Sequence, residues 1–284
     1  MTRARRLLLA LCLVAAGCGD DGETEDGSGT TVATVPQPGT ETTTSGGGTT
    51  ASGDSGEDTP TTASPVTSVA PSFETTGPPG SAAPIFLRPR PATSILVEVG
   101  AEDGAEPTQA TIDHLRNVLA DVSQKPVQMT GVPAPAGRDA WSASDIRRAA
   151  DDVGSGAEGE VAVIRLLFLH GTYAESDTVL GVAVRADTMA IFADRVDEAA
   201  SPLIGPAAIE AAVVVHELGH LLGLVDLYRD TGRDDPEHPG HSTNRGSVMF
   251  WAVESTLVTD LLTGGPPRDF DAADRADLDA IRAS

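Results

Sequence analysis

The chain has 284 residues, and 42 acidic against 19 basic residues give it a formal net charge of −23. Binding to nucleic acid depends on cationic side chains that neutralise phosphates, so we expect no nucleic-acid partner. The same charge repels anionic membrane surfaces, so we expect any membrane attachment to come from a covalent anchor.

Residues 1–18 have the layout of an export signal. A basic start (Arg3, Arg5 and Arg6) is followed by the apolar run LLLALCLVAA. This run is too short to span a bilayer stably. It ends in AAGC, which resembles the lipobox of bacterial lipoproteins and implies that Cys18 is lipid-modified and becomes the mature N-terminus. The expected location is the outer face of the cell membrane, or the secreted fraction if the lipobox is not used.

Residues 19–83 are rich in Ser, Thr, Gly and Pro and contain few apolar side chains. Such a composition cannot form a core, so we predict a disordered linker. As a flexible coil of about 60 residues it would reach roughly 40–45 Å. The predicted folded domain is therefore 84–284.

The first part of this domain predicts alternating strands and helices. Apolar and β-branched runs indicate strands, and apolar residues at helical spacing indicate helices. In chain order we expect a strand at 94–100, a helix at 107–124, a short strand at 126–131, a helix at 141–154, a long apolar strand at 160–171, and strands at 179–187 and 188–194.

The second part predicts helices and irregular chain. A buried helix should begin near Pro206 and end at Gly223, a polar loop should follow, and a last helix should begin near Asp269 or Asp271. Alternating elements followed by helices predict an α/β (α+β) domain.

The segment HELGHLLGLVD (216–226) carries the chemistry. On a helix, His216 and His220 lie about 40° apart around the axis, and Glu217 lies in the same sector. Three ionisable groups on a buried helix are costly unless something pairs with them, and a zinc ion held by both imidazoles would do so. A catalytic zinc site also needs a third protein ligand.

Extended as HExxHxxGxxD, the segment resembles the metzincin clan of zinc metalloproteases, and its closing aspartate resembles snapalysin-like members. The resemblance implies Asp226 as the third ligand and a fold with a mixed twisted sheet, a central active-site helix and a C-terminal helix. It also implies a methionine turn beneath the metal, for which SVMF supplies Met249. Trp251 stands where some metzincins have a tyrosine, so no phenol ligand is expected.

A second resemblance keeps the third ligand open. The segment DPEHPGHSTNRGSVMFW is similar to a histidine-bearing loop of certain bacterial lipoprotein relatives, which makes His241, and less so His238, an alternative to Asp226. Cysteines bracket that loop in those relatives. This chain has Ser242 and Ser247 instead, so packing or ions must hold the loop.

Together these features predict a zinc endopeptidase in which Glu217 is the general base for peptide hydrolysis. The strand at 181–187, if it forms the sheet edge as in metzincins, could pair with an extended peptide or protein substrate. His170 is expected to be structural. Two alternatives remain: a non-catalytic module with a closed structural zinc site, and a zinc hydrolase of non-peptide amides.

Overall fold

The computed structural model describes residues 73–154, 159–261 and 264–284. The predicted signal segment 1–18, with Cys18, and most of the predicted linker 19–83 lie outside the described residues. Within the described ranges, no helix combines the length and the apolar character that crossing a bilayer requires.

The described elements follow the predicted order and add several short ones. They are, in chain order, α1 (Ala83–Leu87), β1 (Ser94–Ala101), α2 (Gln109–Ser123), β2 (Val127–Gly131), β3 (Ala140–Trp141), α3 (Ala143–Val153), β4 (Val161–Leu169), β5 (Thr172–Tyr173), β6 (Gly181–Arg185), β7 (Thr188–Phe192), α4 (Ala193–Ala199), α5 (Pro206–Leu221), β8 (Asp234–Asp235), β9 (His238–Ser242), the 3-10 helix η1 (Trp251–Glu254), α6 (Val258–Leu261) and α7 (Ala272–Ala283).

The central sheet has five strands in the order β2-β1-β4-β7-β6. Strands β2, β1, β4 and β7 pair in parallel, and β6 runs antiparallel to β7. The predicted α+β class with a mixed sheet is confirmed. The predicted edge position of the strand at 181–187 is also confirmed, because β6 ends the strand order.

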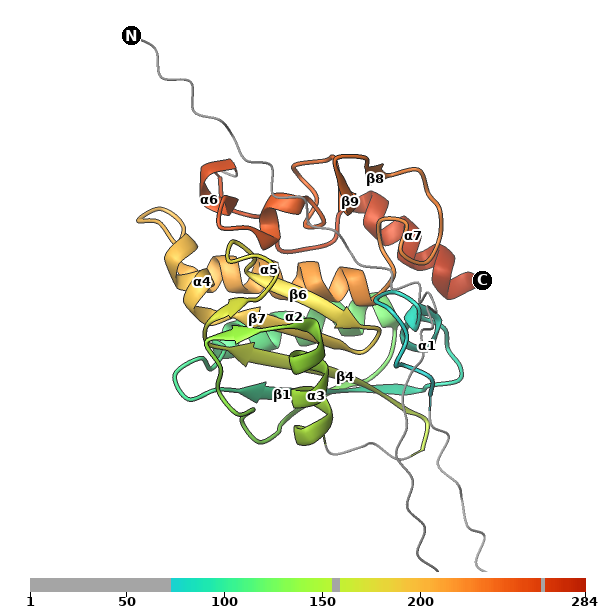
Figure 1. The fold of residues 1–284 in the computed structure, drawn as a ribbon. Coiled ribbons are helices and arrows are strands. Elements are labelled where there is room, and N and C mark those ends of the chain that lie inside the picture. Colours follow the sequence, from blue (N-terminus) through green and yellow to red (C-terminus); the bar gives the residue numbers. More distant parts are fainter. Residues whose placement is uncertain (1–72, 155–158, 262–263) are drawn as a thin grey trace, which may run out of the picture. The chain divides into compact units, whose positions relative to one another are not determined.

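Helices cover both faces of this sheet. Helices α2 and α5 pack together, with α5 against β6 and β7, whereas α3 lies on the other face (Figure 1). A large core fills the α2–α5 side, and a smaller core around Trp141 and Phe192 lies under α3. Strand β7 is fully buried, and β4 is continuously buried from Leu166 to Leu169, because both faces of the sheet are covered there.

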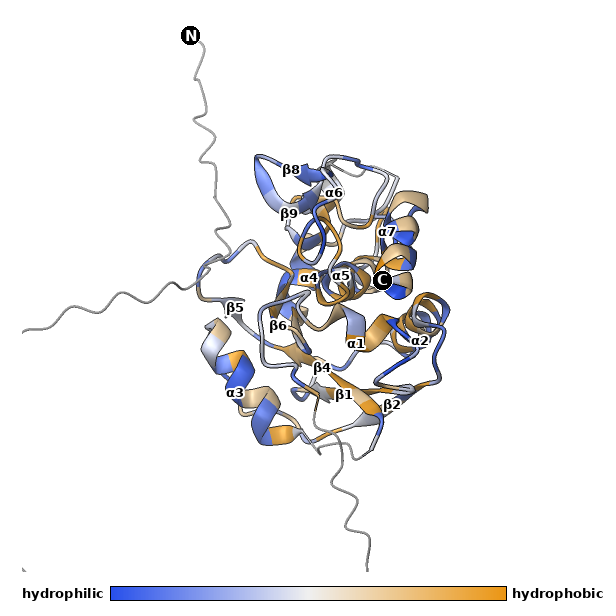
Figure 2. Cartoon of the chain, turned by 90° about the vertical axis from the view of Figure 1, so that its right-hand side faces the viewer, coloured by the Kyte–Doolittle hydropathy of each residue, from blue (hydrophilic) through white to orange (hydrophobic). Residues whose placement is uncertain are grey.

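Helix α5 lies in the middle of the molecule, between the sheet and the C-terminal elements β8, β9, η1 and α6 (Figure 1). It begins at Pro206, whose fixed φ suits a first helical turn, and Gly223 just beyond its end has φ +80°. Apolar residues surround its axis, so it is buried on nearly all sides. Figure 2 shows the contrast between the hydrophobic central strands and the hydrophilic β8–β9 hairpin.

Part of the segment assigned to the linker belongs to the folded unit. Phe73 packs against the large core, Ala82 and Ala83 are buried, and Thr75 Oγ1 donates to Asp187 Oδ2 at 2.7 Å. The folded chain therefore begins before residue 84. Its first helix, α1, was not predicted because five residues are too few to show helical periodicity.

The polar loop after α5 is also more ordered than predicted. It contains the β8–β9 hairpin and η1, and the last helix begins after Asp271, whose side chain caps it by accepting from the N–H groups of Ala273 and Asp274. This hairpin matters for the site because it carries His241.

Candidate metal centre

Three of the predicted site residues lie on α5 and are buried there. His216 and Glu217 are fully buried, and His220 is 8% exposed. His216 Nδ1 lies 2.7 Å from the carbonyl oxygen of Val248. Because a carbonyl only accepts, Nδ1 carries the proton and donates it, which leaves the lone pair of His216 on Nε2.

The two helix imidazoles face each other through these nitrogens. His220 Nε2 lies 3.1 Å from His216 Nε2. Two nitrogens each about 2.0–2.1 Å from one tetrahedral ion would be roughly 3.3 Å apart, so the spacing fits a shared metal. Burial, and then the neighbouring His216 and His241, hold the pKa of His220 well below its ordinary value. The ring is therefore neutral, as a metal ligand must be.

His241 joins them from strand β9. Its ring centroid lies 5.1 Å from those of both His216 and His220. The β8–β9 hairpin brings it there, and Gly240, with φ +85° and its N–H donating to Asp234, makes the tight approach possible. His241, the alternative third ligand predicted from the sequence, therefore lies beside the two histidines of α5.

Glu254, at the end of η1, is the fourth member of the group. Its Oε1 lies 3.1 Å from His241 Nε2, and its Oε2 lies 3.6 Å from His216 Nε2. One ligand atom from each of His216, His220, His241 and Glu254 lies within 4.8 Å of the others. Sequence analysis missed Glu254. The one feature of the sequence that could have indicated Glu254 is its position directly after the apolar run VMFWAV.

Several polar atoms of this group are buried without a hydrogen-bond partner among the described residues. They are both carboxyl oxygens of Glu217, Nδ1 of His220 and both ring nitrogens of His241. Buried polar atoms without partners are costly and usually mark a missing ion or water. Three imidazoles and a carboxylate are donors that zinc accepts, so the residues present fit Zn²⁺.

Glu217 lies beside the histidines, under strand β6. A methyl group on Gly181 would lie 2.9 Å from Glu217 Oε1, so only a glycine lets the strand pass this close. Burial first, and then the charge of Glu254, raise the pKa of Glu217 well above its ordinary value. A raised pKa brings a carboxylate closer to the range in which it can accept a proton and return it near neutral pH.

Asp226, the favoured third ligand in the sequence analysis, lies outside this group. Val225 and Asp226 both have positive φ, and Asp226 Oδ1 accepts hydrogen bonds from the backbone N–H and the hydroxyl of Thr231. Leu224 and Val225 are buried instead. The turn after Gly223 thus directs its apolar residues into the core, while the carboxylate of Asp226 faces Thr231 in its own loop.

His238, the less favoured alternative, is also elsewhere. Its ring stacks on Trp251 at 4.3 Å between centroids and 8° between planes. Its Nδ1 lies 3.0 Å from Asp235 Oδ2. His238 therefore contacts Trp251 and Asp235 within the β8–β9 region, and Trp251 packs against its ring.

Met249 lies beneath the motif helix, where the resemblance implied a methionine turn. It is fully buried, and its sulfur is the nearest atom to the position that a Cβ on Gly219 would take. Its backbone oxygen accepts from Ser242 N at 2.8 Å, and Phe250 N donates to Ser247 O to close the turn. The turn therefore connects α5 with the segment that carries His241.

A hydrogen bond and ion pairs hold this loop, where packing or ions were expected in place of cysteines. Ser247 Oγ donates to Asp274 Oδ2 at 2.9 Å, and Asp274 in turn pairs with Arg233. Arg233 also pairs with Asp277 on α7. The loop is thus attached to the C-terminal helix through a buried carboxylate.

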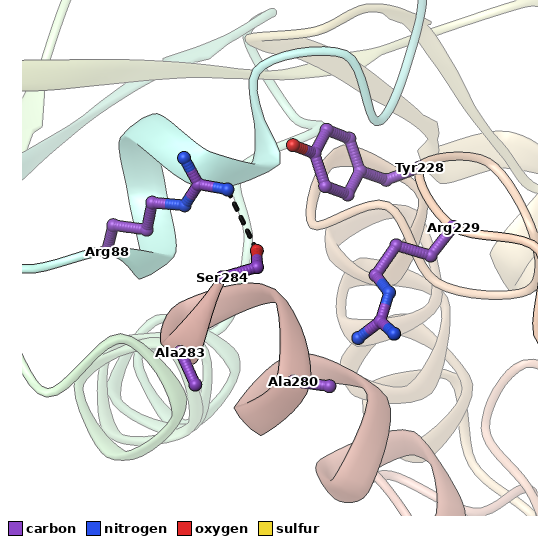
Figure 3. Close-up of a pocket in the computed structure, with 6 residues that line it drawn as sticks. All are labelled: Arg88, Tyr228, Arg229, Ala280, Ala283 and Ser284. Atoms are coloured by element: carbon purple, nitrogen blue, oxygen red, sulfur yellow. Dashed lines mark hydrogen bonds between the residues drawn. The ribbon is translucent and has the colours of Figure 1, made fainter.

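A hollow of about 740 Å³ lies away from this centre (Figure 3). Arg88, Tyr228 and Arg229 line it together with three residues near the C-terminus, and Arg88 donates to Ser284 Oγ at 2.8 Å. None of the clustered histidines or glutamates lines it.

Three solved structures are similar to this chain. Archaemetzincin from Methanopyrus kandleri is 20% identical, with 70% of this chain and 100% of that chain covered and a TM-score of 0.47. A zinc-dependent peptidase from Methanocorpusculum labreanum is 16% identical. The match covers 65% of this chain and 100% of that chain, with a TM-score of 0.43. Archaemetzincin from Archaeoglobus fulgidus, complexed with malonate, is 14% identical. The match covers 64% of this chain and 98% of that chain, with a TM-score of 0.38.

No protein-family model and no curated protein sequence matches this chain. At the identities and TM-scores of the three structures, their likeness carries no argument about activity. The case for a function therefore depends on the chain's own side chains.

Proposed function

We propose that this chain is a zinc-dependent endopeptidase whose metal is held by His216, His220 and His241. The convergence of three buried imidazoles beside an unpaired glutamate supports this most directly. The third ligand in this proposal is His241 in place of Asp226, because the carboxylate of Asp226 is engaged by Thr231.

The residues divide the chemistry between them. Bound zinc would polarise a scissile carbonyl and make a water molecule more acidic. Glu217 accepts the proton of that water and later gives it to the leaving amine. His216 keeps its Nε2 directed at the metal because Nδ1–H donates to Val248. Burial of the centre excludes bulk water and strengthens these charge interactions.

The edge strand β6 supports a peptide substrate. It ends the sheet and crosses directly over Glu217 at Gly181. An extended peptide could add to such an edge through backbone hydrogen bonds, and the scissile bond would then lie near the general base. Hydrolysis of a non-peptide amide uses the same metal chemistry and remains the alternative for substrate class.

We also propose that the enzyme is a lipoprotein on the outer face of the cell membrane, attached through Cys18. The sequence from Met1 to Cys18 supports this, and the charge of −23 would keep the domain off anionic surfaces. The linker would then serve as a tether.

The test of the activity is Glu217→Gln in the full chain. The variant should bind one zinc ion per chain, as the wild type does, while cleavage of a peptide library falls by about 10²- to 10⁴-fold because the base is lost. Chelator should abolish wild-type cleavage. Undiminished cleavage by the variant would refute the role of Glu217, and stoichiometric zinc with no cleavage by the wild type would favour a structural zinc module.

A further inference from the structure

Glu254 has the most solvent-facing side chain of the four clustered residues. Its side chain is 15% exposed, compared with 0% for that of His216 and 8% for that of His241. It belongs to η1, a single turn of four residues, whereas His216 and His220 belong to the long helix α5. Glu254 is therefore the member of the cluster most accessible from solvent.

Glu217 and Glu254 place two carboxyl groups beside the three imidazoles. Both carboxyl oxygens of Glu217 are buried without a hydrogen-bond partner among the described residues, and the carboxyl oxygens of Glu254 face His216 and His241. Two adjacent buried carboxylates repel each other unless a positive charge lies between or beside them. A divalent ion held by the three imidazoles would balance both carboxylates, and the carboxyl oxygens of Glu254 already lie 3.1 and 3.6 Å from two of the imidazole nitrogens.

The backbone of Glu254 is joined to the start of the edge strand. Leu180 N donates to Glu254 O at 2.7 Å, and Thr256 N donates to Thr178 O at 2.9 Å. Ser255 also forms an antiparallel bridge with Val179. Residues 178–180 lead directly into β6, so a ligand that pairs with β6 would lie next to the segment that carries Glu254.

We propose that Glu254 is a fourth, displaceable protein ligand that closes the metal site until a ligand bound along β6 takes its coordination position. The inference rests on the proposed zinc function and adds a means of regulation to it. A site with four protein ligands has no position for water or substrate, so Glu254 must leave before Glu217 can act. The carboxylate exchanges with an oxygen donor, and no covalent bond is made or broken.

The test uses the full chain loaded with Co²⁺ in place of zinc, because Co²⁺ gives a visible spectrum that reports its ligands. Imidazole, which is neutral, is the probe for an open coordination position. If the closed form is at least about 90% populated, Glu254→Gln should bind imidazole at least about tenfold more tightly than the wild type. Glu254→Asp keeps the charge but shortens the side chain, and it should also bind imidazole more tightly than the wild type. It serves as a second variant in case Glu254→Gln does not fold.

Glu217→Gln is the matched control, since it removes the neighbouring carboxylate without removing the proposed fourth ligand. Its imidazole affinity should stay near that of the wild type. Equal affinity in the wild type and both Glu254 variants would overturn the inference, as would an equal increase in Glu217→Gln. Failure of the wild type to take up Co²⁺ would overturn the proposed function as well, so the two failures are distinguishable.

Discussion

The imidazole of His216 has a different kind of neighbour at each nitrogen. Nδ1–H donates to the Val248 carbonyl, and Nε2 faces His220 and Glu254. This division fixes the tautomer, so His216 is preorganised as a ligand before any ion binds. His241 Nε2 instead faces Glu254 Oε1 at 3.1 Å. Its position depends on the hairpin that carries it.

The choice of third ligand gives a prediction at this scale. His241→Ala should weaken zinc binding by about 100-fold or more, because one of the three proposed nitrogen ligands is lost. Asp226→Ala should leave zinc affinity within a few-fold of the wild type and cost about 1 kcal/mol or more of stability, because its hydrogen bonds to Thr231 are lost and alanine tolerates φ +65° less well than aspartate.

Competition with a chromophoric chelator measures both affinities, and urea unfolding of the metal-free proteins measures the stabilities. Loss of stoichiometric zinc in Asp226→Ala, with normal zinc in His241→Ala, would restore the aspartate as the ligand.

Among the elements, α5 and the methionine turn fit each other through a glycine. Gly219 lies on the helix face above Met249, and the sulfur of Met249 occupies the space that a side chain at 219 would need. Phe270 lies 3.2 Å from the same position. Because the packing is this close, the methionine turn and α5, which carries His216 and His220, hold each other in position.

Gly219→Ala should therefore destabilise the protein by about 1–3 kcal/mol, through overpacking against a turn that cannot move freely. Gly131→Ala on β2 is the matched control, because a Cβ there would meet no atom within 4 Å. Its stability should be unchanged or slightly higher, since alanine replaces a flexible residue in a strand. Urea unfolding of both variants compares them, and equal stabilities would contradict the packing argument.

A second element-scale contact ties β4 to α4. His170 Nδ1 lies 2.8 Å from Asp194 Oδ1, and His170 Nε2 lies 3.1 Å from the carbonyl oxygen of Asp103. Both partners are acceptors, so the ring satisfies both only when it is protonated. The hydrogen bond with Asp194, foremost, raises the pKa of His170 above its ordinary value. This supports the structural role expected from the sequence.

The sign of the pH dependence follows from that shift. Because the pKa of His170 is higher in the folded than in the unfolded state, its protonation stabilises the fold. This stabilisation is complete at pH values below the unfolded-state pKa of about 6.5, and it is lost as the pH rises through the folded-state pKa. The wild type should therefore exceed His170→Gln in unfolding free energy by more at about pH 5.5 than at about pH 8.5. Denaturant unfolding at both pH values measures this. Asp194→Asn should remove most of the difference, and a pH-independent difference would contradict the assignment.

For the whole molecule, the strong negative charge and the single cysteine at the predicted lipid-attachment position make a prediction about location. Cys18→Ala should move the protein from the detergent-extractable membrane fraction to the soluble exported fraction, because the covalent anchor is lost. Fractionation and immunodetection in a lipoprotein-processing bacterium measure this. A high-salt wash is the control, since a protein of net charge −23 is not expected to be held by surface charge. An unchanged membrane fraction for Cys18→Ala would contradict lipid anchoring.

The sequence by itself determined the elements whose signals are local. The strands β1, β4 and β7, the helices α2, α3, α5 and α7, and the pairing of His216 with His220 follow from apolar periodicity and helix geometry. Both histidines lie on one helix, so their spacing is set within a single turn. The segment 73–83 was misassigned because its packing depends on distant partners such as Asp187.

Only the tertiary structure decided which side chains gather beside His216 and His220. Asp226 is nearer in sequence to the histidines, yet the burial of Leu224 and Val225 turns it away. His241 and Glu254 arrive through a hairpin and a one-turn helix whose positions depend on Met249, on Ser247 with Asp274, and on bonds to residues 178–180. These contacts join segments far apart in the chain, and their geometry is fixed by the packing of the core rather than by any local pattern.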